Sequence, residues 1–104
     1  MTYKEKIDYL KSYKANLGVL RRLESREKFF RLSDAEKKEK NEALLKTEKV
    51  AEEISLVASP VLRQVLREKY INGATFSALG EAFGYSTRHI QRLHKVAVEE
   101  FEVL

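Results

Sequence analysis

The sequence predicts an all-α protein, with a long N-terminal helical hairpin followed by a C-terminal part of three shorter helices. Apolar residues recur at intervals of three and four, which is the period of a helix with one buried face. The 104 residues include one proline and four glycines, too few for the many turns of a β-sandwich. Cysteine is absent, which excludes a disulfide framework and a thiolate metal site.

The first predicted helix starts at the N-terminus and runs to about Phe30. Thr2 and Glu5 have the spacing of a capping box, in which each side chain accepts a hydrogen bond from the other residue's backbone amide. The apolar positions of this helix are Tyr3, Ile7, Leu10, Tyr13, Leu17, Leu20 and Leu23.

A second capping box, Ser33 with Glu36, predicts another long helix. Because few residues separate the two helices, an antiparallel hairpin over residues 1–58 is the simplest arrangement. We expect this hairpin to form a homodimer; the alternative is a monomer whose hairpin folds back on the C-terminal part. The apolar positions expected to pack in the second helix are Leu44, Leu45, Ala51, Ile54 and Ala58.

Residues 59–104 carry signals for three more helices. Ser59, Thr75 and Ser86 are preferred N-cap residues, and Gly73 and Gly84 are suited to the helix ends. The predicted helices are Pro60 to about Ile71, Phe76 to Phe83 and Thr87 to about Phe101.

Residues 76–95 fit the pattern of a helix-turn-helix. Gly80 stands where the second helix must cross so closely that only a very small residue fits. Gly84 stands at the turn, where a positive φ is needed. The apolar positions of the pattern are Leu79, Phe83, Tyr85, Ile90 and Leu93, with Tyr85 expected to pack under the turn.

The exposed face of the last predicted helix is cationic. Arg88, Arg92 and Lys95 lie opposite the apolar side, and Gln91 lies at the edge. Arginine can pair with guanine and glutamine with adenine in the major groove. We interpret His94, close to the apolar side, as a packing residue. The candidate DNA-binding residues are Ser86, Thr87, Arg88, Gln91, Arg92 and Lys95, with possible phosphate contacts from Arg63, Arg67 and Lys69.

The charge distribution agrees with binding to a polyanion. The formal net charge is +4. Residues 1–32 carry nine basic and four acidic side chains, and residues 60–95 carry six and two. The basic residues of the first helix could contact the DNA backbone or a partner such as RNA polymerase. They are Lys11, Lys14, Arg21, Arg22 and Arg26.

No motif indicates catalysis, a metal or a cofactor. The chain has no nucleophile elbow, no glycine-rich phosphate loop and no cluster of carboxylates. No apolar run approaches the ~20 residues of a membrane helix, and the N-terminus has no secretory h-region. We therefore expect a cytoplasmic protein without enzymatic activity.

Residues 54–101 resemble the fourth region of bacterial sigma factors, and more closely the small phage and prophage regulators of the ArpU/RinA type. The resemblance lies in the run from Leu66 through Tyr70-Ile71 to Gly84-Tyr85-Ser86 and in Arg92-Leu93-His94. It implies a transcriptional regulator with a sigma-like helix-turn-helix, encoded by a phage or prophage. The first helix of the motif lacks the family's usual paired acidic residues, so that face could contact another protein.

Two other functions remain open from the sequence. A phage terminase small subunit, which packages DNA, also combines a helix-turn-helix with helical oligomerisation. A protein-interaction module that binds RNA polymerase or a repressor would use the same fold without DNA.

Overall fold

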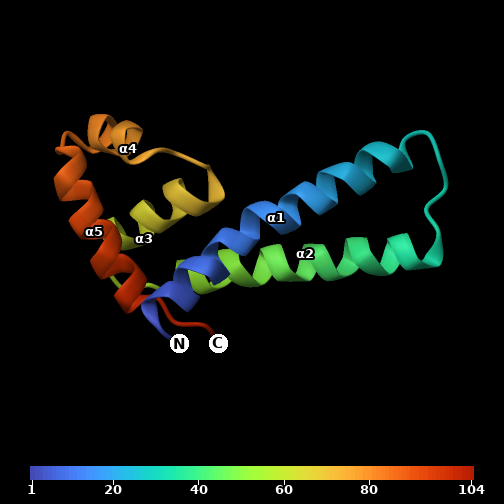
Figure 1. The fold of residues 1–104 in the computed structure, drawn as a ribbon, viewed down its shortest axis with the longest axis horizontal. Helices are drawn as coiled ribbons and strands as arrows, with labels where there is room; N and C mark the ends of the chain where they lie inside the picture. Colours follow the sequence, from blue (N-terminus) through green and yellow to red (C-terminus); the bar gives the residue numbers. More distant parts are fainter.

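The computed structural model describes all 104 residues and contains helices only. Two long helices form an antiparallel hairpin that extends to one side, and the C-terminal helices gather around its base (Figure 1). The molecule measures 48 × 28 × 21 Å along its principal axes. The helices are α1 (Tyr3–Glu27), α2 (Asp34–Ser55), α3 (Pro60–Leu66), a π-helical turn η1 (Arg67–Ile71), α4 (Phe76–Phe83) and α5 (Thr87–Glu100).

Both predicted capping boxes form at the starts of the long helices. The hydroxyl of Thr2 accepts a hydrogen bond from the Glu5 amide at 3.1 Å, and the Glu5 carboxylate accepts one from the Thr2 amide at 3.0 Å. Ser33 and Glu36 make the same pair of bonds at 3.2 and 3.0 Å. Each box satisfies two amides that have no partner inside the helix, and this defines where α1 and α2 begin.

The first helix ends earlier than predicted. It stops at Glu27, and the amides of Phe29 and Phe30 both donate to the carbonyl of Arg26 in a final turn. Phe29 and Phe30 therefore lie in the loop at the far end of the hairpin, where they are 79% and 61% exposed.

The prediction of the buried face of α2 was wrong for its two leucines and for Ala58, which is exposed and lies beyond the end of the helix. Leu44 and Leu45 are 42% and 65% exposed, because they lie about 100° and 200° around the helix from the position of Ala43. The small side chains of Ala43 and Thr47 face α1 instead. The phase of α2 against α1, rather than the apolar character of the leucines, decides which residues are buried. The buried residues of α2 are Ala43, Thr47, Val50, Glu53 and Ile54.

One hydrophobic core joins the base of the hairpin to the C-terminal helices. Its largest fully buried member is Phe101, at the end of α5. The predicted division between residues 58 and 59 falls between α2 and α3, and the core extends across it. The core comprises Leu10, Val50, Ile54, Val57, Leu66, Tyr70, Ala97, Val98 and Phe101.

A buried carboxyl group connects both ends of the chain. Glu53 of α2 is 2% exposed, and it accepts hydrogen bonds from the Tyr9 hydroxyl and, at 2.5 Å, from the Leu104 amide. Burial and this contact with Glu53 raise the pKa of Tyr9. The C-terminal segment is thereby held against α1 and α2.

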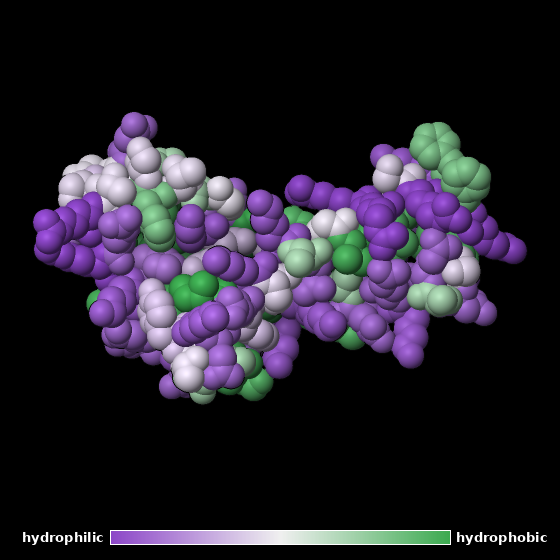
Figure 2. Space-filling view, in the orientation of Figure 1, coloured by the Kyte–Doolittle hydropathy of each residue, from purple (hydrophilic) through white to green (hydrophobic).

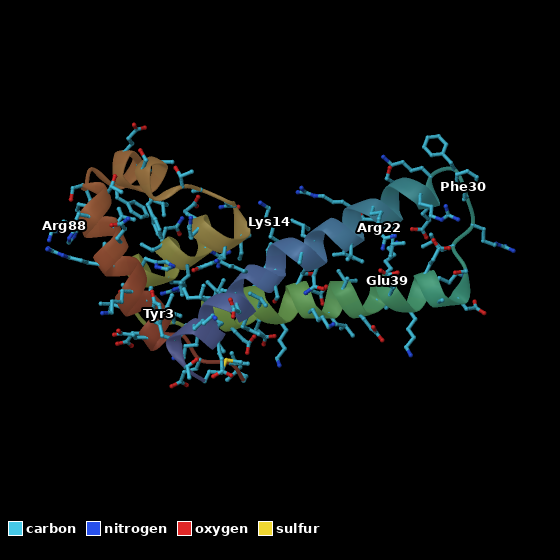
Figure 3. All side chains as sticks on the ribbon, viewed as in Figure 1. Tyr3, Lys14, Arg22, Phe30, Glu39 and Arg88 are labelled. Atoms are coloured by element: carbon cyan, nitrogen blue, oxygen red, sulfur yellow. The ribbon has the colours of Figure 1, made fainter.

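The outer half of the hairpin is held by ion pairs. The pairs are Arg22 with Glu39 at 2.7 Å, Arg26 with Glu36 at 2.7 Å and Lys40 with Glu27 at 2.6 Å (Figure 3). Every pair has at least one well-exposed partner, so each stabilises the hairpin only slightly.

The third predicted helix is not α-helical throughout. It changes from α-helix to a π turn at Arg67, and Asn72 ends it with a bond from its amide to the Arg67 carbonyl. Gly73 follows with φ 73°.

No helix of the chain has both the length and the apolar character needed to cross a membrane.

Candidate nucleic-acid interface

The turn between α4 and α5 depends on two glycines, as predicted. Gly84 ends α4 with φ 71° and ψ 28°, a conformation that costs a residue with a Cβ more than glycine. A Cβ on Gly80 would lie 2.7 Å from the carbonyl oxygen of Tyr85 and 3.5 Å from the amide nitrogen of Thr87. The turn and the start of α5 therefore rest directly on the backbone of α4.

The helix packing follows the predicted pattern except at Tyr85. Leu79 and Ile90 are 2% and 0% exposed, whereas Phe83 and Leu93 are half-buried. Tyr85 is 44% exposed, so the expectation that it packs under the turn was wrong. Its backbone carbonyl occupies the space beside Gly80, and its ring packs edge-on against His89 with the ring centroids 4.6 Å apart.

The six predicted DNA-binding residues are all exposed, at the N-cap of α5 or along its first nine residues. The Ser86 hydroxyl caps the helix by accepting a hydrogen bond from the His89 amide at 3.1 Å. Figure 3 shows Arg88 at the end of the molecule remote from the hairpin loop. None of the three cations of α5 pairs with a carboxylate, since every ion pair of the chain lies in the hairpin. The exposed residues are Ser86, Thr87, Arg88, Gln91, Arg92 and Lys95.

His94 is a packing residue, as predicted. It is 7% exposed, and a ring nitrogen lies 2.6 Å from the Tyr70 hydroxyl. The Phe76 ring meets it edge-on at 5.0 Å. Burial, with a smaller effect from the charge of Lys69, lowers the pKa of His94 to about 4. The neutral imidazole thus joins α5 to η1 and α4, and burial raises the pKa of Tyr70 to about 12.

The possible phosphate contacts are less exposed than the α5 face. Arg63, Arg67 and Lys69 are all half-buried. The ammonium of Lys69 lies 4.3 Å from the centroid of the Phe76 ring. Nε of Arg63 is buried without a hydrogen-bond partner. The structure therefore separates these residues from the freely exposed cations of α5.

The exposed pair of Tyr85 and His89 was missed from the sequence. The helix-turn-helix pattern assigns position 85 to the interior, but its place directly before the Ser86 cap brings it to the surface beside α5. An aromatic ring and an imidazole therefore flank the cationic face.

No group of three or more His, Cys, Asp or Glu side chains is arranged to hold a metal ion.

Comparison with protein-family models, with curated proteins and with solved structures finds no match to this chain.

Proposed function

We propose that the protein is a sequence-specific regulator of transcription that binds double-stranded DNA, with α5 and its first following residue (residues 87–101) as the recognition helix in the major groove. The observation that carries the proposal is the exposed cationic face of α5, held rigidly by the glycine turn. A major groove about 12 Å wide accepts one α-helix with its side chains.

The cations of α5 are available to an anionic partner. Arg88, Arg92 and Lys95 recur at intervals of four and three, so they form one row along two turns of the helix. A helix surface with an unpaired cationic row attracts phosphates, and the attraction weakens as salt screens it. Arginine in the same row can read guanine through two hydrogen bonds.

The start of α5 supplies the positioning contacts. The hydroxyl of Thr87 and the free amides of the first helical turn can donate to a phosphate, whose charge the positive end of the helix dipole also favours. Such a contact sets the register of the helix in the groove, and Gln91 then lies at the edge of the row that faces the bases.

DNA titrations at several salt concentrations test this proposal. Wild type should bind duplex DNA from around its own gene, with log affinity falling linearly with log salt. Arg88→Ala/Arg92→Ala should lose about tenfold or more on that site and less on random duplex. Lys37→Ala/Lys38→Ala, at two exposed positions early in α2, removes the same charge and should retain specific binding. Equal losses for both variants would contradict a reading role for α5.

We also propose that the protein acts as a homodimer through the outer half of the hairpin. The base of the hairpin packs against the C-terminal helices in the core, whereas Phe29 and Phe30 at its loop stay more than half exposed. Figure 2 shows hydrophobic side chains exposed at this end of the molecule. Contact between two such apolar ends would bury these rings. Because α5 lies at the opposite end of the 48 Å molecule, the two recognition helices of this dimer would bind well-separated sites rather than adjacent half-sites.

Sedimentation across a concentration series tests the dimer. Wild type should dimerise at micromolar concentration, and Phe29→Ser/Phe30→Ser should be monomeric with unchanged helix content. A wild type that stays monomeric at high micromolar concentration would exclude the dimer. An assembly of eight or more subunits would favour the DNA-packaging alternative.

A further inference from the structure

A second basic surface lies in a cleft between α1 and the η1 turn, away from α5. The cleft has a volume of about 560 Å³, within the usual range of small-ligand sites. Four cations line it, three from α1 and one from η1: Lys11, Lys14, Arg21 and Lys69. Figure 3 places Lys14 beside η1, on the side of the C-terminal helices remote from Arg88.

None of the cations of the cleft forms an ion pair within the protein. No aspartate or glutamate lines the cleft. Like charges three or four residues apart destabilise a helix, and Lys11 and Lys14 have that spacing. By contrast, Arg22 and Arg26 on the same helix pair with glutamates of α2. An external anion would supply what the cleft lacks.

The rest of the lining suits a nucleotide. Half-buried Tyr13 presents an aromatic ring beside the cations, and bases stack on such rings. The amide of Gly73 donates to no backbone carbonyl, and the side chain of Asn72 makes no hydrogen bond within the protein. These polar groups stand at the edge of the cleft opposite α1.

The spread of the cations sets the size of the anion. Lys11 and Arg21 are ten residues apart, so about 15 Å of helix separates them. Such a row offers contacts to several phosphate groups at once, so it suits a ligand that carries more than one phosphate. The aromatic ring favours nucleotide units over an acidic peptide.

We propose that this cleft binds a ligand with two or more phosphate groups, which is either a free nucleotide or a stretch of nucleic-acid backbone. The ligand would bridge α1 of the hairpin to η1 of the C-terminal part. Lys69 also covers the Phe76 ring of α4, so the bound phosphates would contact the element on which the helix-turn-helix rests. The proposal does not depend on DNA binding by α5.

Isothermal titration of the full chain with ATP, pyrophosphate and a 12-base-pair duplex tests the proposal at ~50 mM salt. The variant Lys14→Gln/Arg21→Gln removes two exposed cleft cations, and Lys37→Gln/Lys38→Gln is the charge-matched control outside the cleft. Arg88→Ala/Arg92→Ala separates this site from the α5 face. Circular dichroism verifies that each variant is folded.

ATP or pyrophosphate should bind wild type, the control and the α5 variant with the same affinity within twofold, and the cleft variant at least tenfold more weakly. If neither binds, the duplex decides. An affinity for the duplex that falls tenfold in the cleft variant and stays within twofold of wild type in the control supports nucleic-acid backbone as the ligand. Loss of the same size in the control, no dependence of any probe on Lys14 and Arg21, or equal binding of a glutamate-rich peptide would overturn the proposal.

Discussion

Alanine at Gly80 and alanine at Gly18 should change stability in opposite directions, although both glycines lie inside helices. At Gly80 the new Cβ would lie 2.7 Å from the backbone oxygen of Tyr85, where ordinary contact needs at least 3.4 Å. That oxygen belongs to the turn between Gly84 and the Ser86 cap, so it has little freedom to move. At Gly18 nothing lies within 4 Å of the new Cβ.

The magnitudes follow from two opposing effects. Either replacement gains about 1 kcal/mol because alanine is the better helix former. Overpacking against a backbone atom costs up to about 3 kcal/mol, which leaves Gly80→Ala about 2 kcal/mol less stable than wild type. Gly18→Ala should be about 0.5–1 kcal/mol more stable. With about 4–8 °C per kcal/mol, Gly80→Ala should melt about 10 °C lower.

Urea unfolding followed by circular dichroism measures both variants against wild type. The midpoints should move apart while the slope of free energy against urea stays constant, which shows that the exposed surface is unchanged. If both variants were stabilised, α5 would not rest on the backbone at Gly80, and the geometry of the turn would be wrong.

Three further predictions concern buried or capping groups. Because burial lowers the pKa of His94 to about 4, the unfolded chain binds a proton more readily than the folded one below about pH 6.5. Stability should thus fall between about pH 6.5 and 4, and His94→Gln should show a smaller slope in urea unfolding over that range; an unchanged slope would contradict a buried neutral imidazole. Tyr9→Phe removes a hydrogen-bond donor to buried Glu53 and should lower the free energy of unfolding, measured by thermal melting, by about 1–3 kcal/mol. A change below about 0.5 kcal/mol, which is typical of surface substitutions, would contradict this hydrogen bond. Ser86→Ala should cost about 1 kcal/mol in urea unfolding, and no cost would show that the hydroxyl does not cap α5.

Most of the fold could be predicted because its signals are local. A capping box involves four consecutive residues, and Thr2 and Ser33 formed theirs as expected. The helix-turn-helix could also be predicted from local signals. Gly80 lies in close contact with the backbone of the turn, and Gly84 has a positive φ. Such requirements leave few alternatives to glycine.

The errors arise where distant residues decide the outcome. The phase of α2 depends on which side α1 and the C-terminal core occupy, and so Leu44 and Leu45 are exposed while Thr47 is buried. The exposure of Tyr85 follows from its own carbonyl filling the space at Gly80.

The basic cleft could not be predicted as a site, although the cations of the first helix were noted. Its shape depends on α1 meeting the η1 turn, two segments about fifty residues apart in the chain. The π turn itself, which brings Lys69 to the cleft, has no recognisable signal in the residues Arg67 to Ile71.

Backbone amide chemical shifts recorded by NMR during titration with a specific duplex test the central claim most directly, because they locate the bound surface without any mutation. The shifts should be largest between residues 86 and 95, at the start of α5. Little change is expected at the loop that carries Phe29 and Phe30. Shifts confined to the hairpin, or no shifts at ~50 mM salt, would contradict the proposal that α5 is the recognition helix.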